Sequence, residues 1–280
     1  MVNTLNQKSL ESPRPVTPLG ILTEHLQAAA QLLDQETSVS ADIKQHVQQA
    51  LKLASGLDAY VETCTSEESP ALKAIANKTS QENWNQRFSD GTTNRHLEQE
   101  MLSGHVEGQA LKMFVHMTRA QRILDIGMFT GYSALAMAEA LPEEGVLVAC
   151  EVDPYVATFA QELFRESPHG NKIQVELGSA LQTLNKLATA QESFDLVFID
   201  ADKKEYVQYF QTLLDSNLLA RGGFICVDNT LLQGQPYLPP EERSENGEAI
   251  AQFNRVVAAD SRVEQVLLPV RDGLTIIRHL

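Results

Sequence analysis

The chain has 280 residues, of which 43% are hydrophobic and 21% charged, and this composition is typical of a globular protein with a large core. Its 22 Lys and Arg residues against 37 Asp and Glu residues give a formal net charge of -15. Phosphate backbones and anionic lipids repel so acidic a chain, so nucleic acid and membrane surfaces are not expected partners.

The cysteines and the first residues indicate the compartment. Cys64, Cys150 and Cys226 lie far apart and form no CxxC pair, so neither a disulfide framework nor a zinc site is expected. The first twenty residues hold no apolar run long enough for a signal peptide, and later runs fall short of the roughly 20 residues of a membrane span. We therefore expect a soluble, cytoplasmic protein.

The first part of the chain has helical patterning. Leu22, Leu26, Ala29 and Leu33 recur at three- and four-residue steps, and residues 43–54 repeat this spacing. Each stretch is therefore predicted to form a helix with one apolar face.

The polar stretch from Gln81 to Asn94 is typical of a loop. We expect its aromatic residues, Trp84 and Phe88, to pack in the core rather than to form a lid. A further helix is predicted from Leu97 to Met117. Residues 1–95 are therefore expected to form an N-terminal helical extension.

After Arg122 the pattern changes to short β-rich runs separated by amphipathic segments, as in a parallel sheet covered on both faces by helices. The last two runs flank Arg271-Asp272-Gly273, which suits a hairpin turn, so one edge strand is expected to run antiparallel. Residues 96–280 are thus predicted to form a doubly wound α/β domain. The expected strands are Arg122–Ile126, Val146–Glu151, Ile173–Leu177, Phe194–Ile199, Gly223–Asp228, Val263–Val270 and Leu274–Arg278.

The turn after the first strand, from Asp125 to Ser133, has the form DxGxxxG. A dinucleotide fingerprint would also need small residues where Phe129 and Tyr132 stand. An acid and two glycines, Gly127 and Gly131, can instead hold an amino-acid group and let a nucleoside lie on the backbone. S-adenosylmethionine has this shape, although a purely structural turn is the alternative.

Two further positions fit an adenosyl group. Glu151 ends the second strand, where a carboxylate can accept both ribose hydroxyls; the alternative is a solvated acid. Ala180 follows the third strand, where an adenine edge would lie, and a plain helix start explains it nearly as well.

Acidic side chains end two neighbouring strands. Asp200 follows the fourth strand, and Asp228 and Asn229 follow the fifth. Three oxygen donors at one edge suit a hard cation such as Mg²⁺, Mn²⁺ or Ca²⁺, whereas capping of the following helices is the alternative. Lys203, three residues after Asp200, could act as a general base near that cation, or be a surface lysine as we expect for Lys204. The aromatic signature of amino-group methyltransferases is missing here, which favours an oxygen nucleophile.

These motifs carry a family resemblance. The segment from Met101 to Leu280 resembles the cation-dependent class I O-methyltransferases, the group of caffeoyl-CoA and catechol O-methyltransferases, through EGQ at Glu107, DIGMFTGYS, FIDADK and DNTL at Asp228. The resemblance implies a Rossmann-like class I methyltransferase sheet, a homodimer and a small-molecule substrate with adjacent oxygens. It places Asp125 where caffeoyl-CoA members generally have Glu. The implied sites are cofactor contacts at Ser103, Asp125, Gly127, Met128, Gly131, Ser133, Glu151, Ala180 and Asp200, a metal at Asp200, Asp228 and Asn229, and catalysis by Lys203 and Asp200.

A narrower group within the family is also similar along the whole chain. It is the cyanobacterial O-methyltransferases of mycosporine-like amino acid biosynthesis, matched by RPVTPLGIL from Arg14, GHVEGQALKMFVHMT from Gly104 and LLQGQPYLPPEERSENGEAIAQFN from Leu231. This similarity implies methylation of a demethyl precursor to 4-deoxygadusol. A catechol or caffeoyl-type phenolic is the alternative substrate, and a CoA thioester is not expected.

Two other classes of protein share part of the pattern. A nicotinamide dehydrogenase would use the same sheet and Glu151, but it gives no reason for the acidic residues at strands four and five to coincide. A noncatalytic adenosyl-binding protein would keep the glycine loop without those acids. Methyl transfer that EDTA abolishes would distinguish a cation-dependent methyltransferase from both of these alternatives.

Overall fold

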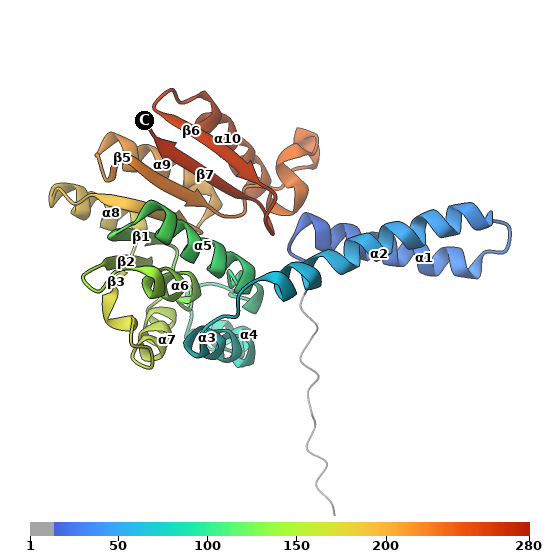
Figure 1. The fold of residues 1–280 in the computed structure, drawn as a ribbon, viewed down its shortest axis with the longest axis horizontal. Coiled ribbons are helices and arrows are strands. Elements are labelled where there is room, and N and C mark those ends of the chain that lie inside the picture. Colours follow the sequence, from blue (N-terminus) through green and yellow to red (C-terminus); the bar gives the residue numbers. More distant parts are fainter. Residues whose placement is uncertain (1–13) are drawn as a thin grey trace, which may run out of the picture.

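The computed structural model describes residues 14–280, which form a seven-stranded sheet with helices on both faces (Figure 1). The strand order is β3-β2-β1-β4-β5-β7-β6, in which β7 runs antiparallel to both β5 and β6 and the first five strands are parallel. The predicted Rossmann-like sheet with an antiparallel edge hairpin is confirmed. The strands are β1 (Arg122–Ile126), β2 (Val146–Glu151), β3 (Ile173–Leu177), β4 (Phe194–Ile199), β5 (Leu219–Val227), β6 (Val263–Leu268) and β7 (Leu274–His279).

The first four predicted strands match these bounds, and the fifth does not. β5 begins at Leu219 rather than at Gly223, because Leu219 already pairs with Phe194 before a register shift. The glycines at 222 and 223 therefore lie inside an irregular strand, and the sequence pattern there resembles a turn.

Alternate residues of the central strands face two different cores, as the two-residue period of a strand requires. Leu124 and Val197 face a core closed by α8, α9 and α10. Ile123 and Leu196 face a second core closed by α3, α5, α6 and α7. The helices are α1 (Pro18–Gln35), α2 (Ala41–Cys64), α3 (Pro70–Gln81), α4 (Trp84–Ser89), α5 (His105–Thr118), α6 (Tyr132–Ala140), α7 (Pro154–Phe164), α8 (Ala180–Thr189), α9 (Tyr206–Asp215) and α10 (Glu245–Ala259).

The helical extension departs from prediction in two places. The expected loop from Gln81 to Asn94 contains α4, whose Trp84 is buried as predicted while Phe88 is 45% exposed. The expected helix from Leu97 begins only at His105. Gly104 before it has φ +77°, outside the right-handed helical region, and this residue ends the preceding segment.

The first two helices form a hairpin that projects from the side of the sheet domain (Figure 1). Thr17 and Ser40 begin them as N-caps that accept backbone N–H groups. Ala30 is the one buried residue of α1, and every residue of α2 is at least partly exposed.

The expectation about a signal peptide falls mainly on residues 1–13, outside the described part of the chain. Within residues 14–280, no helix has both the length and the apolar character needed to span a bilayer.

Candidate functional site

The strand order reverses between β1 and β4, and the crevice at the carboxyl ends of these strands is where α/β sheets bind ligands. The Asp200 N–H donates to the Ile126 carbonyl at 2.9 Å, which holds the two strand ends together. A Cβ on Gly127, which has φ +98°, would lie 2.0 Å from the Asp200 carbonyl oxygen. Only glycine therefore allows the loop after β1 to approach the loop after β4.

Two cavities open at this crevice. The larger has a volume of about 520 Å³ and the smaller about 240 Å³, and Gly127 and Glu151 line both. Ala180 lines the smaller cavity, as an adenine contact would. The larger cavity brings together half of the twelve predicted site residues, including the whole predicted metal and catalytic set, namely Gly127, Glu151, Asp200, Lys203, Asp228 and Asn229.

Glu151 is held in one orientation by the backbone around it. Its Oε2 accepts the Phe129 N–H at 2.9 Å, and its Oε1 accepts the N–H groups of Val152 and Asp153 at 2.7 and 2.8 Å. Burial raises the pKa of the Glu151 carboxyl, and these backbone hydrogen bonds act in the opposite direction. The carboxylate is thus a fixed acceptor at the boundary of both cavities.

The other predicted cofactor residues lie beneath the cavity walls or beside them. Asp125 is fully buried and accepts the Ser133 hydroxyl at 2.9 Å, and burial raises the pKa of Asp125 to about 7. Met128 packs in the core, so only its backbone could meet a cofactor. Gly131, at φ +89°, caps α6. Ser103 is also buried. None of these five lines either cavity in the described chain.

The acidic residues after β5 form a connected cluster. The Asn229 N–H donates to Asp228 Oδ1 at 2.7 Å, and the Asn229 amide donates to Asp272 Oδ2 at 3.4 Å. Burial, reinforced by the charge of Asp200, raises the pKa of Asp228 to about 7, and burial raises that of Asp272 to about 6. Sequence reasoning treated Asp272 only as a turn residue, because nothing in its spacing links the β6–β7 turn to the end of β5.

A second unanticipated site residue is Glu107 in α5. It is buried, and neither carboxylate oxygen has a hydrogen-bond partner among the described residues. Burial, followed by the charge of Asp228, raises the pKa of Glu107 well above its usual range. Arg271 Nε lies 3.7 Å from Glu107 Oε2, and the same guanidinium donates to the Ser103 carbonyl. The only sequence signal for Glu107 is its place in the EGQ motif.

Lys203 lies at the base of the larger cavity. Its ammonium group donates to Asp200 Oδ1 and to the Tyr206 hydroxyl, both at 2.8 Å. Burial alone lowers the pKa of Lys203, but the neighbouring Asp200 and Tyr206 raise it, and the net shift is upward. In this arrangement Lys203 holds its proton and neutralises Asp200.

The donor chemistry of the cluster fits a hard divalent cation. Between residues 14 and 280, no group of three or more His, Cys, Asp or Glu side chains is arranged to hold a metal ion. The predicted metal ligands, Asp200, Asp228 and Asn229, are not such a group, because they combine two carboxylates with one amide. Asp200 raises the pKa of Asp228, so the two carboxylates repel each other and a cation would relieve that repulsion. The metal site stays a prediction.

Comparison with known proteins identifies the family. The O-methyltransferase family profile matches residues 62–280. The chain belongs to the O-methyltransferase family. Caffeoyl-CoA O-methyltransferase 1 from Arabidopsis thaliana is 34% identical to this O-methyltransferase over 188 residues, which cover 64% of this chain and 72% of the relative. The catechol O-methyltransferase domain-containing protein 1 from Mus musculus is 38% identical over 172 residues, which cover 61% and 64%.

Solved structures agree with this assignment. An SAH-bound methyltransferase from Podospora anserina has a TM-score of 0.68 and 29% identity, and the match covers 82% of this O-methyltransferase and 96% of that chain. An O-methyltransferase from Streptomyces achromogenes, solved with SAM and involved in tomaymycin synthesis, has a TM-score of 0.67 and 26% identity, with 80% and 96% covered. The predicted resemblance to this family is confirmed.

Proposed function

We propose that this O-methyltransferase moves the methyl group of S-adenosylmethionine to one of two adjacent oxygens on a small ring, with demethyl-4-deoxygadusol as the substrate. One observation carries the proposal: Glu151, the expected ribose acceptor, and the acidic cluster at Asp200 and Asp228 line the same cavity. A donor bound along Glu151 and an acceptor bound at the acids would therefore meet. Relatives solved with SAM or SAH support the identity of the donor.

The chain's own residues would bind and orient the two reactants. Glu151 would accept the ribose hydroxyls, and the loop at Gly127 would let the donor lie on the backbone. Methyl transfer is an in-line displacement, so alignment of oxygen, methyl and sulfur accounts for much of the rate. The cavity shared by both sets of residues would hold the two reactants next to each other.

Asp200, Asp228 and Asn229 would hold a divalent cation, with Mg²⁺ preferred for all-oxygen donors. A bound cation would supply positive charge that lowers the pKa of the acceptor hydroxyl and of Lys203. Once it has lost its own proton, the Lys203 amine would accept the hydroxyl proton, and its nitrogen lies 2.8 Å from Asp200 Oδ1, a predicted cation ligand.

Residues near the start of the described chain enclose one side of the larger cavity, where the substrate would bind. Arg14, Val16 and Thr17 line the larger cavity, and they lie outside residues 62–280 that match the family profile. The wall on this side therefore comes from a part of the chain that the family profile does not cover, and there it could select a substrate of its own. A catechol or a caffeoyl-type phenolic is the second candidate, since the Arabidopsis relative is named for caffeoyl-CoA.

The test uses the purified full chain with methyl-labelled S-adenosylmethionine. Demethyl-4-deoxygadusol, catechol and caffeoyl-CoA are offered separately, each after EDTA treatment and again after Mg²⁺ is restored. We expect transfer to the first to be fastest, to vanish with EDTA and to return with Mg²⁺. Faster transfer to caffeoyl-CoA would overturn the substrate, and transfer indifferent to EDTA would overturn the metal.

A further inference from the structure

Phe129 has a backbone conformation that its side chain disfavours. Its φ is +48°, in the left-handed region that residues with a Cβ seldom adopt, and such a conformation persists only where neighbours hold it. In this conformation its N–H donates to Glu151 Oε2 at 2.9 Å. Val152 and Asp153 hold the Oε1 atom of Glu151, whereas the position of Oε2 depends on what holds Phe129.

The Trp84 ring packs against Phe129, in a cluster that also contains Leu97 and Val156. The two ring centroids are 5.3 Å apart, and the Trp84 side chain is 5% exposed. The indole N–H donates to the Thr79 carbonyl at 2.9 Å, and the Thr79 hydroxyl donates to the Thr130 hydroxyl at 2.8 Å. The helices α3 and α4 thus contact two consecutive residues of the loop after β1.

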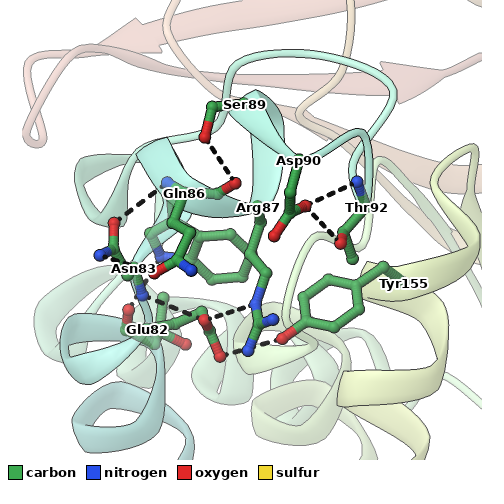
Figure 2. A network of polar contacts seen from close by, with 10 residues as sticks. Glu82, Asn83, Gln86, Arg87, Ser89, Asp90, Thr92 and Tyr155 are labelled. Atoms are coloured by element: carbon green, nitrogen blue, oxygen red, sulfur yellow. Dashed lines mark hydrogen bonds and ion pairs between the residues drawn. The ribbon is translucent and has the colours of Figure 1, made fainter.

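Polar contacts fasten α4 to α7, the helix that follows Glu151. Glu82 accepts hydrogen bonds from Arg87 and from the Tyr155 hydroxyl, both at 2.9 Å, and Figure 2 shows this bridge. The Asn94 N–H donates to the buried Asp153 carboxylate at 2.7 Å. The helix that carries Trp84 is therefore attached to the segment that directly follows Glu151.

We propose that Trp84 is a positioning residue for the methyl donor: its ring holds Phe129 so that the Phe129 N–H keeps Glu151 aimed at the donor's ribose. This inference rests on the proposed function, in which Glu151 binds that ribose. Trp84 lines neither cavity of the described chain, so it acts through Phe129 and touches no ligand.

The test measures binding of S-adenosylhomocysteine by calorimetry, which needs neither acceptor nor metal. Trp84→Leu should weaken binding about tenfold or more, the loss expected when a hydrogen bond to a charged group is misplaced. Trp84→Phe keeps a ring against Phe129 and should recover most of the affinity. Thr79→Val, which removes the Thr130 contact, should weaken binding in the same direction.

A matched control separates positioning from simple destabilisation. Phe194 is a fully buried aromatic residue at the opposite end of the sheet, so Phe194→Leu should lower Tm without changing the affinity for S-adenosylhomocysteine. In turnover assays Trp84→Leu should raise KM for S-adenosylmethionine and leave KM for the acceptor unchanged. Unchanged ligand affinity in folded Trp84→Leu would overturn the inference.

Failure of the wild-type chain to bind S-adenosylhomocysteine would overturn the proposed function and the inference together. Normal wild-type binding with an insensitive Trp84→Leu overturns the inference alone.

Discussion

At the scale of single residues, Lys203 and its neighbour Lys204 form a natural pair for comparison. Lys203 is 14% exposed and contacts Asp200 and Tyr206, whereas Lys204 is 56% exposed and pairs with Glu245. We predict that Lys203→Met lowers kcat by about 10²- to 10⁴-fold, the usual contribution of a general base, with nearly unchanged affinity for S-adenosylhomocysteine. Lys204→Met should leave both unchanged. Equal loss of kcat and affinity in Lys203→Met would show that the lysine is structural.

Asp125 gives a prediction about pH. Burial raises its pKa from 3.8 to about 7, so the folded chain retains a proton that the unfolded chain releases above about pH 4. The stability that this proton contributes is fully present below about pH 4 and is lost as the pH rises through 7.

Asp125→Asn should abolish this pH-dependent loss of stability, because the amide does not titrate and its oxygen can still accept the Ser133 hydroxyl. In metal-free buffer, the free energy of unfolding of the variant relative to wild type should therefore rise by about 3 kcal/mol between about pH 5 and pH 8. Urea titrations of both proteins at several pH values measure this difference in the free energy of unfolding. A difference that stays constant across this range would contradict the prediction.

At the scale of elements, one carboxylate forms a polar bridge between α4 and α7. Glu82 is 15% exposed and bridges Arg87 and Tyr155, whereas the Glu176–Lys186 pair lies on the surface. We predict that Glu82→Gln lowers Tm by about 2–4 °C, the effect of one lost hydrogen bond in a chain of this size. Glu176→Gln should have no measurable effect, because exposed ion pairs contribute little. Calorimetry compares the two variants, and equal shifts would refute the role of Glu82.

At the scale of the whole molecule, we propose that the helical hairpin is where two copies associate. Leu53, Leu57 and Tyr60 lie at helical spacing along one face of α2 and are 78%, 50% and 68% exposed. A stripe of large apolar side chains so exposed is unusual on the surface of a monomer. Burial of such a stripe against a second copy would stabilise a homodimer.

Sedimentation of the full chain at micromolar concentration should therefore give a dimer. Leu57→Glu should shift the equilibrium toward monomer, since a charge in an apolar interface is costly to bury. Lys52→Glu, on an exposed neighbouring position, is the matched control and should leave the dimer intact. A monomeric wild-type chain would refute the proposal.

The sequence predicted the sheet better than the helices around it. The first four strands are apolar runs with polar boundaries, and their bounds follow from local pattern. The sequence does not predict α4, because a six-residue helix with a polar surface has little periodicity. Trp84 is buried by the loop after β1 together with α7, and both are distant from it in the sequence. The start of α5 was missed because the left-handed conformation of Gly104 decides it.

Local spacing along the chain is enough to predict the α/β order, the family motifs and the residues that end each strand. The meeting of Glu107, Asp228 and Asp272 was decided only by the tertiary structure. These carboxylates come from α5, the end of β5 and the β6–β7 turn, and their raised pKa values arise from burial together. Burial depends on how distant segments pack, and no local spacing in the chain contains that information.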